Sequence, residues 1–227
     1  MVAGLSAEGS ERKTDRIEAF TDAVLAIAIT LPILDIKLPR LGADGDLAGA
    51  YRALAPSYVA YALSVVVIGL YWSYSHFSGK IFLKTDHGFN LLTVVFLALV
   101  SATPFPARPF VEHVGDANAP AAATVYAGLL AAPSIAWTVR WQYARRVGLL
   151  DPHLSSSYLR KVTLRYAVTS LVLLAGTALT AIVNWRLGLA VIALATLSFV
   201  FPPRKPEFKP GEEPDDELQE ADERRSS

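Results

Sequence analysis

Apolar and polar residues alternate along the chain in blocks, and several apolar blocks are long enough to form membrane-spanning helices. A bilayer hydrocarbon core of about 30 Å requires about 20 apolar residues in a helix. Six segments meet or approach this length: residues 16–38, 51–79, 87–111, 120–145, 158–183 and 185–201. The pattern therefore predicts an all-α polytopic membrane protein with six transmembrane helices.

Changes in composition divide the chain into three parts. We predict a polar N-terminus over residues 1–15, a six-helix domain over 16–202 and an acidic, disordered tail over 203–227. The tail has too little apolar surface to fold by itself. Within the six-helix domain, only Asn184 and its neighbours separate the last two helices, which predicts a tight helical hairpin.

Composition supports the membrane class. Only 19% of residues are charged and the net charge is zero, whereas soluble domains carry about a quarter charged residues. The chain contains no cysteine, which excludes disulfides and thiolate metal sites. There is no basic stripe with interleaved aromatic residues, so we expect no nucleic-acid partner.

The distribution of lysine and arginine predicts the orientation. If the N-terminus is inside, fourteen of these residues fall in the inner segments and five in the outer ones. Arg140, Arg145, Arg146, Arg160 and their neighbours are assigned to one inner segment in this count. Positive residues concentrate on the cytoplasmic side, so both termini are expected to be cytoplasmic.

The first apolar helix carries one face that is apolar except at its ends. At about 100° per residue, one stripe collects Arg16, Phe20, Ala23, Ile27, Thr30, Leu31 and Leu34. Asp22 lies off this stripe, and Leu25 lies opposite Arg16, where it should face other helices or lipid. Ordinary helix packing gives the same spacing, so the stripe alone leaves its role open.

Three polar residues are expected at a similar depth, near the inner ends of their helices. An ionised aspartate near hydrocarbon normally has a partner, and a cluster of Asp22, His76 and Asn90 with Trp72 beside it would supply one. The alternative is that each residue bonds a backbone group or reaches interfacial water. A metal at His76 is disfavoured, because no second ligand on that helix has the required spacing.

Part of the sequence resembles a known family. The segment RIEAFTD at residues 16–22 resembles the Arg-x-x-x-Phe-Ser-Asp signature of the transmembrane protein 175 family of potassium channels. The resemblance continues through YWSYSHF at 71–77 and FNLLTVVFLALVSATPFP at 89–106. A single six-helix repeat is the form found in bacterial members.

The resemblance implies a homotetramer in which four first helices surround a central pore. The family lacks the carbonyl filter of other potassium channels, and this chain has no TVGYG. The constriction would be Ile27, followed by apolar rings of Leu31 and Leu34, with Thr30 as a candidate selectivity hydroxyl. A structural polar network is also implied, comprising Arg16, Phe20, Thr21, Asp22, Trp72, His76 and Asn90.

The chain departs from the family pattern at three positions. Thr21 replaces the usual serine and keeps its hydroxyl, and Ala23 replaces the common glycine. Pro32 stands where an apolar residue such as leucine is usual. Because proline removes a backbone donor and can kink a helix, it brings the pore-facing register of Leu34 into question.

We therefore predict a potassium-permeable cation channel of the plasma membrane that contacts lipid and needs no metal or cofactor besides the permeant K⁺. The alternative is a secondary transporter, which would show an inverted repeat and broken helices near the midplane. No repeat relates 16–110 to 119–202, and Pro104-x-Pro106 is placed at a helix end. An enzyme would require a nucleophile or metal set beside Asp22 and His76, and a scaffold would tolerate polar residues in the stripe.

Overall fold

Helices make up almost all regular structure in the computed structural model, which describes residues 8–37, 46–79, 81–203 and 205–211. The elements are α1 (Glu8–Thr30), η1 (Leu31–Asp35), α2 (Leu47–Ala53), α3 (Ala55–Gly79), α4 (His87–Ala102), α5 (Pro104–His113), α6 (Ala119–Val147), α7 (Ser156–Ile182) and α8 (Trp185–Leu197). Among the described residues, β-pairing is limited to two isolated bridges. The all-α prediction is confirmed.

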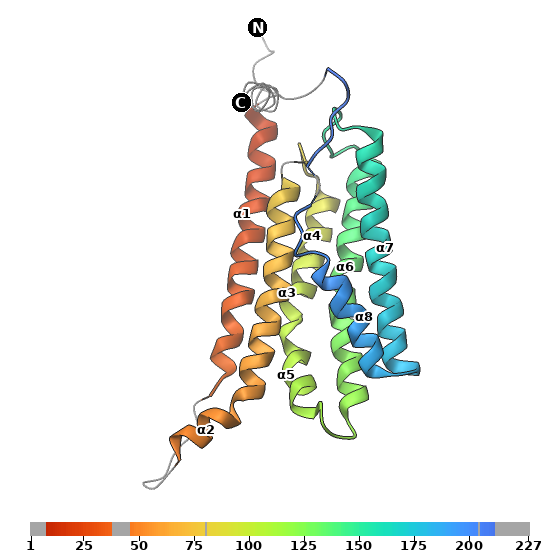
Figure 1. Cartoon of the computed structure of the whole chain (residues 1–227). Helices are drawn as coiled ribbons and strands as arrows, with labels where there is room; N and C mark the ends of the chain where they lie inside the picture. The colour runs from red at the N-terminus through yellow and green to blue at the C-terminus, as the bar shows by residue number, and fades with distance from the viewer. Residues whose placement is uncertain (1–7, 38–45, 80, 204, 212–227) are drawn as a thin grey trace, which may run out of the picture.

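The long helices stand side by side and form one elongated bundle (Figure 1). Five helical stretches of 21 to 29 residues are long and apolar enough to cross a membrane: Thr14–Leu34, Ala55–Gly79, His87–His113, Ala119–Val147 and Ser156–Ile182. A shorter apolar helix covers Trp185–Val200. These six stretches correspond to the six predicted segments.

The prolines of the third stretch lie at the end of α4, as predicted, but a second helix, α5, follows at once. Thr103 separates α4 from α5, and both its backbone N–H and its hydroxyl donate to the carbonyl oxygen of Val100, at 3.1 and 2.8 Å. Pro104 and Pro106 then occupy the first turn of α5. Proline is tolerated there because the first-turn N–H groups have no helical partner, so the helix resumes.

The predicted hairpin of the last two helices is present. The side chain of Asn184 caps α8 by accepting from the N–H groups of Arg186 at 2.9 Å and Leu187 at 3.2 Å. Two glycines let the helices approach closely: a Cβ added at Gly188 would lie 2.6 Å from the carbonyl oxygen of Gly176. No larger residue fits at this crossing without displacing one helix.

The start of α1 and the last described residues lie at the same end of the bundle (Figure 1), called the inner end below. Residues 205–211 were expected to be part of a disordered tail over 203–227, but they pack against the α6–α7 connection. Ser155 N–H donates to the carbonyl of Glu207 at 2.7 Å, and Phe208 packs on the hydrophobic core. An aromatic residue and backbone pairing thus anchor this segment, and the residues after 211 lie outside the described part.

The α1 helix stands at one edge of the bundle (Figure 1). Among the long helices, it packs mainly against α3 and α4. In its most apolar window 17% of the residues are buried, compared with 22–44% in the other four long stretches. Of the five, α1 is therefore the helix least covered by its own chain.

Candidate pore-lining face

The predicted stripe of α1 points away from the rest of the chain. Ile27 and Leu31 are each 54% exposed and Leu34 is 71% exposed, and Phe20 is also exposed. Leu25, on the opposite side of the helix, is 0% exposed and belongs to the hydrophobic core. The single chain thus packs one face of α1 and leaves the stripe available to another surface.

The helix changes its geometry before it reaches Leu34. The α-helical hydrogen bonding ends at Thr30, and Pro32 lies in the first turn of the 3₁₀ helix η1. Residues three apart are eclipsed in a 3₁₀ helix, so Leu34 lies on the same face as Leu31. The proline tightens the turn, but the apolar stripe continues through it.

Thr30 contributes an oxygen atom to this face. Its hydroxyl donates to the carbonyl oxygens of Ala26 at 3.0 Å and Ile27 at 3.1 Å, and the side chain is exposed. Because the hydroxyl proton is engaged by the helix itself, the lone pairs of Oγ1 point outward. A threonine in this state is an acceptor that can coordinate a cation.

A shallow apolar groove flanks the stripe. It has a volume of about 530 Å³ and runs between the end of α1 and the α4–α5 break, where Pro104 and Phe105 form its far wall. Ile27 and Leu34 line the near wall. Phe105 is 77% exposed, so this flank of α1 is apolar and uncovered as well.

Tryptophan, rather than histidine or asparagine, is the hydrogen-bonding partner of the α1 carboxylate. Trp72 Nε1 donates to Asp22 Oδ1 at 3.1 Å. The ring of His76 stacks on Trp72, with 5.9 Å between ring centroids and 24° between ring planes. These three predicted residues come together and join α1 to α3 near the inner end.

The remaining predicted network residues have other positions. Thr21 and Asp22 both line a cavity of about 40 Å³ between α1, α3, the start of α4 and α6, but the Thr21 hydroxyl donates to the carbonyl of Ile17 on its own helix at 2.7 Å. Asn90 Oδ1 is buried and has no hydrogen-bond partner among the described residues. Arg16 and Phe20 are exposed on the α1 face.

Arg140 is a buried cation that sequence reasoning missed. The charge count assigned it to an inner loop segment, yet it is 5% exposed inside α6. Its guanidinium carbon lies 4.3 Å from the ring centroid of Trp137 and 5.2 Å from that of Phe89, and Nη1 donates to the Thr93 hydroxyl at 3.5 Å. Aromatic faces attract such a cation. The sequence feature that could have indicated this burial is Trp137, an aromatic residue one helical turn before Arg140.

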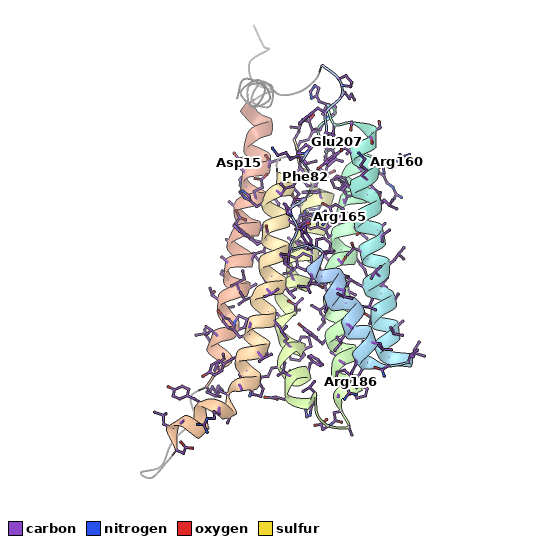
Figure 2. All side chains as sticks on the ribbon, viewed as in Figure 1. Asp15, Phe82, Arg160, Arg165, Arg186 and Glu207 are labelled. Atoms are coloured by element: carbon purple, nitrogen blue, oxygen red, sulfur yellow. The ribbon has the colours of Figure 1, made fainter. Side chains whose placement is uncertain are left out.

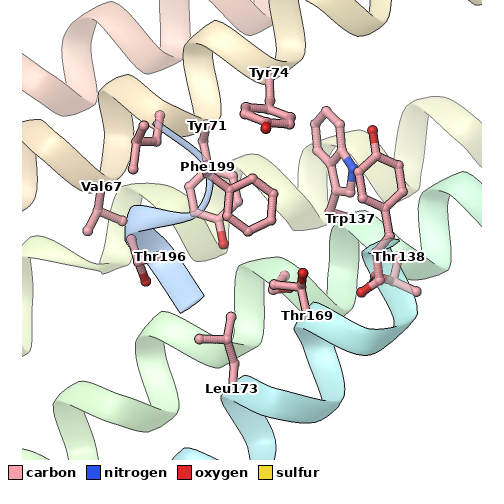
Figure 3. A pocket seen from close by; sticks show the side chains of 12 residues that line it. Val67, Tyr71, Tyr74, Trp137, Thr138, Thr169, Leu173, Thr196 and Phe199 are labelled. Carbon is pink, nitrogen blue, oxygen red and sulfur yellow. Dashed lines mark hydrogen bonds between the residues drawn. The ribbon is translucent and has the colours of Figure 1, made fainter. Parts of the chain in front are cut away.

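A second cavity of about 40 Å³ lies away from α1, between α3, α6, α7 and the end of α8 (Figure 3). Tyr71 and Trp137 form part of its aromatic wall. Ser134 lines it as well and bonds Ser170 at 3.0 Å between the two Oγ atoms. No residue of the stripe reaches it, so it is a feature of the packed interior rather than of the exposed face.

The outer end of the bundle carries paired charges. Arg108 Nε bonds Glu112 Oε1 at 2.7 Å, and His113 Nδ1 lies 2.7 Å from Asp116 Oδ2. The hydrogen bond to His113, followed by one from the backbone N–H of Asn118, lowers the pKa of Asp116 below its usual value. The carboxylate of Asp116 therefore stays ionised at neutral pH at the outer end of the bundle.

Comparisons with known proteins identify related potassium channels. A family model described as endosomal/lysosomal potassium channel TMEM175 matches residues 16–104. A potassium channel of Streptomyces collinus is 36% identical over 161 residues, covering 70% of this chain and 78% of the relative. A potassium channel of Chamaesiphon minutus is 33% identical over 136 residues, covering 59% of this chain and 67% of the relative.

Solved structures support the same relationship. The crystal structure of a lysosomal potassium-selective channel TMEM175 homolog from Chamaesiphon minutus superposes with a TM-score of 0.67 at 32% identity, covering 82% of this chain and 96% of that one. A variant of the potassium channel MtTMEM175 shares the fold with a TM-score of 0.54 at 20% identity, covering 82% and 88% of the two chains. On these grounds, the chain belongs to the TMEM175 family of potassium channels.

Proposed function

We propose that four copies of the chain surround a central potassium-permeable pore and that the exposed stripe of α1 forms its wall. The observation that carries this proposal is the uncovered apolar face of a helix whose opposite face is fully packed. One helix cannot enclose a pore, and α1, the least buried of the five long stretches, occurs once in each chain. Four copies related by cyclic symmetry would each contribute the same stripe.

In this arrangement, Ile27 forms the narrowest ring, followed by Leu31 and Leu34. The α-helical rise separates Ile27 from Leu31 by about 6 Å, and the 3₁₀ rise separates Leu31 from Leu34 by about 6 Å. Three apolar rings would therefore follow one another over about 12 Å. Such constrictions gate by dewetting, because ions cross only when the rings widen enough to hold water.

Preference for K⁺ over Na⁺ must come from this region, because the chain has no TVGYG filter. The outward lone pairs of Thr30 offer one ring of oxygen ligands between Ile27 and Leu31. The lower dehydration cost of the larger ion is a second source of preference at the apolar rings. Replacing Thr30 by valine, which has nearly the same shape without the oxygen, separates the two: the preference falls only if Thr30 supplies it.

The hydrogen bond from Trp72 to Asp22, with His76 stacked on Trp72, is the support that holds each pore helix against α3. Both bonded side chains are exposed in the single chain, so the network would lie at the edge where the next subunit packs. A neighbouring subunit would also supply contacts for Arg16 and Phe20, which are exposed in the single chain. In this proposal the network is structural and takes no part in coordinating the permeant ion.

The inner end is assigned to the cytoplasm of a plasma membrane. The start of α1 and the segment 205–211 share this end, and the excess of lysine and arginine falls on the same side. Arg140 is buried inside α6, which removes one residue from the inner count and leaves the bias in the same direction. Both termini would then be cytoplasmic.

The test is ion flux from proteoliposomes under opposed K⁺ and Na⁺ gradients, combined with cross-linking of the purified protein in detergent. We expect K⁺ flux that exceeds Na⁺ flux, and cross-linked species up to the tetramer. A protein that cross-links only as a monomer would overturn the pore arrangement. Flux that requires a second solute on the opposite side would instead indicate a secondary transporter.

A further inference from the structure

A second groove runs along the surface of the bundle between α4 and α6. It has a volume of about 650 Å³, with apolar walls formed by Leu91, Leu92 and Val139. Leu91 is 53% and Val139 47% exposed. Arg146 lines the same groove, one residue before α6 ends.

The groove spans the depth of one leaflet. Its α6 wall extends from Thr138 to Arg146, nine residues that are separated by eight helical steps and cover about 12 Å of helix. Half of a bilayer hydrocarbon core is about 15 Å. An acyl chain in the leaflet at the inner end would therefore lie along the apolar walls, and its headgroup would lie at the level of Arg146.

Arg146 is the charge available at the water end of this groove. Its side chain is exposed, and none of the ion pairs within the described part of the chain includes it. Asp86, whose carboxylate accepts from the Tyr143 hydroxyl at 2.9 Å and from the N–H of Phe89 at 2.7 Å, also makes no ion pair with it among the described residues. The guanidinium of Arg146 is therefore available to an external anion.

The inner part of the groove depends on a glycine. A Cβ added at Gly88 would lie 2.7 Å from Cζ of Tyr143 and closer still to its hydroxyl. Gly88 therefore lets Tyr143 lie across the first turn of α4, where Asp86 holds its hydroxyl. This positions an aromatic wall beside Arg146.

We propose that this groove binds an anionic phospholipid of the leaflet at the inner end. The acyl chain packs along Leu91 and Val139, and a phosphate oxygen accepts from the guanidinium of Arg146. A planar guanidinium matches a phosphate group in shape and charge, and basic residues at this depth attract anionic lipids. Leu91 and Val139 lie farther from the inner end than Arg146, an order that matches the acyl chain and the headgroup of a lipid. The proposal does not depend on the pore-lining role of α1.

The test measures lipid retention by the full-length protein purified in detergent. Phosphatidylglycerol or phosphatidylcholine with identical acyl chains is titrated in, and bound lipid is counted by native mass spectrometry. Three variants are compared with the wild type. Arg146→Gln removes the headgroup contact, Val139→Trp fills the groove, and Arg160→Gln removes a charge at the same end of the molecule but on α7 (Figure 2).

We expect Arg146→Gln to weaken phosphatidylglycerol binding about fivefold, equivalent to about 1 kcal/mol at 25 °C, without changing phosphatidylcholine binding. Val139→Trp should weaken both lipids, and Arg160→Gln should leave both within about twofold of the wild type. Leu91→Trp fills the groove from α4 and replaces Val139→Trp if that variant does not purify.

Three results would overturn the proposal. An equal loss in Arg160→Gln would show diffuse attraction to basic residues rather than a site. A change of oligomeric state in Val139→Trp and Leu91→Trp would show that a second copy of the chain occupies the groove. Displacement of phosphatidylglycerol by an equal concentration of inorganic phosphate would show that the apolar walls add nothing to binding.

Discussion

Replacing Ile27 by asparagine should open the pore without unfolding the protein. Four amide groups would enter the ring at which water is excluded, and they can replace part of an ion's hydration shell. Each reduction of about 1.4 kcal/mol in the dewetting barrier raises the crossing rate about tenfold. We expect K⁺ flux to rise by about that factor and the preference for K⁺ over Na⁺ to fall.

The cost in stability follows from the packing of the side chain. Truncating a fully buried leucine or isoleucine costs about 2–5 kcal/mol. Ile27 is 54% exposed in the single chain, so only about half of that contact, or about 1–2 kcal/mol, is at stake. Leu25 is 0% exposed, so Leu25→Asn should cost about 3 kcal/mol or more because it also buries an amide without a partner.

The assay is K⁺ and Na⁺ flux at matched protein incorporation, with thermal unfolding in detergent measured alongside. Leu25→Asn is the control for an effect of any polar residue in α1. Leu34→Asn should act in the same direction as Ile27→Asn, because η1 keeps it on the face of Leu31. The reasoning fails if Ile27→Asn conducts like the wild type, or if Leu25→Asn is the variant that gains flux.

Three further substitutions test the support of the pore helix and the packing of the bundle. Trp72→Phe keeps an aromatic ring but removes the N–H donated to Asp22, so it should cost about 0.5–1.5 kcal/mol and lower the tetramer fraction; in a double-mutant cycle with Asp22→Ala, which removes the acceptor, additive losses would show that the bond contributes nothing. Gly188→Ala should destabilise the protein because its Cβ would clash with the α7 backbone, and each kcal/mol lost should lower the melting temperature by about 2–4 °C. Gly69→Ala is the control, because Gly69 has open space around it and its melting temperature should not fall. Phe208→Asp should release the C-terminal segment, and limited proteolysis would detect faster cleavage; an unchanged cleavage pattern would show that Phe208 does not anchor it.

Local sequence determined the helices and their faces. The apolar blocks predicted all six helical segments, because the length needed to cross hydrocarbon and the period of the α-helix are properties of the chain itself. The same period placed Ile27 and Leu34 on one face and Leu25 on the other, and Asn184 identified the turn between the last two helices. Each of these inferences needs only residues within about two turns of one another.

Tertiary structure decided which of these faces is covered and which residue each polar group meets. Asp22 bonds Trp72 rather than Asn90 because the rotation of α3 and α4 about their axes, set by packing along their whole length, decides which side chain is within reach. Arg140 is buried because aromatic residues from α4 and α6 close around it, although its position in sequence resembles that of an interfacial charge. Residues 205–211 are ordered by contacts with a loop about fifty residues earlier, and no local pattern encodes a contact between segments so far apart.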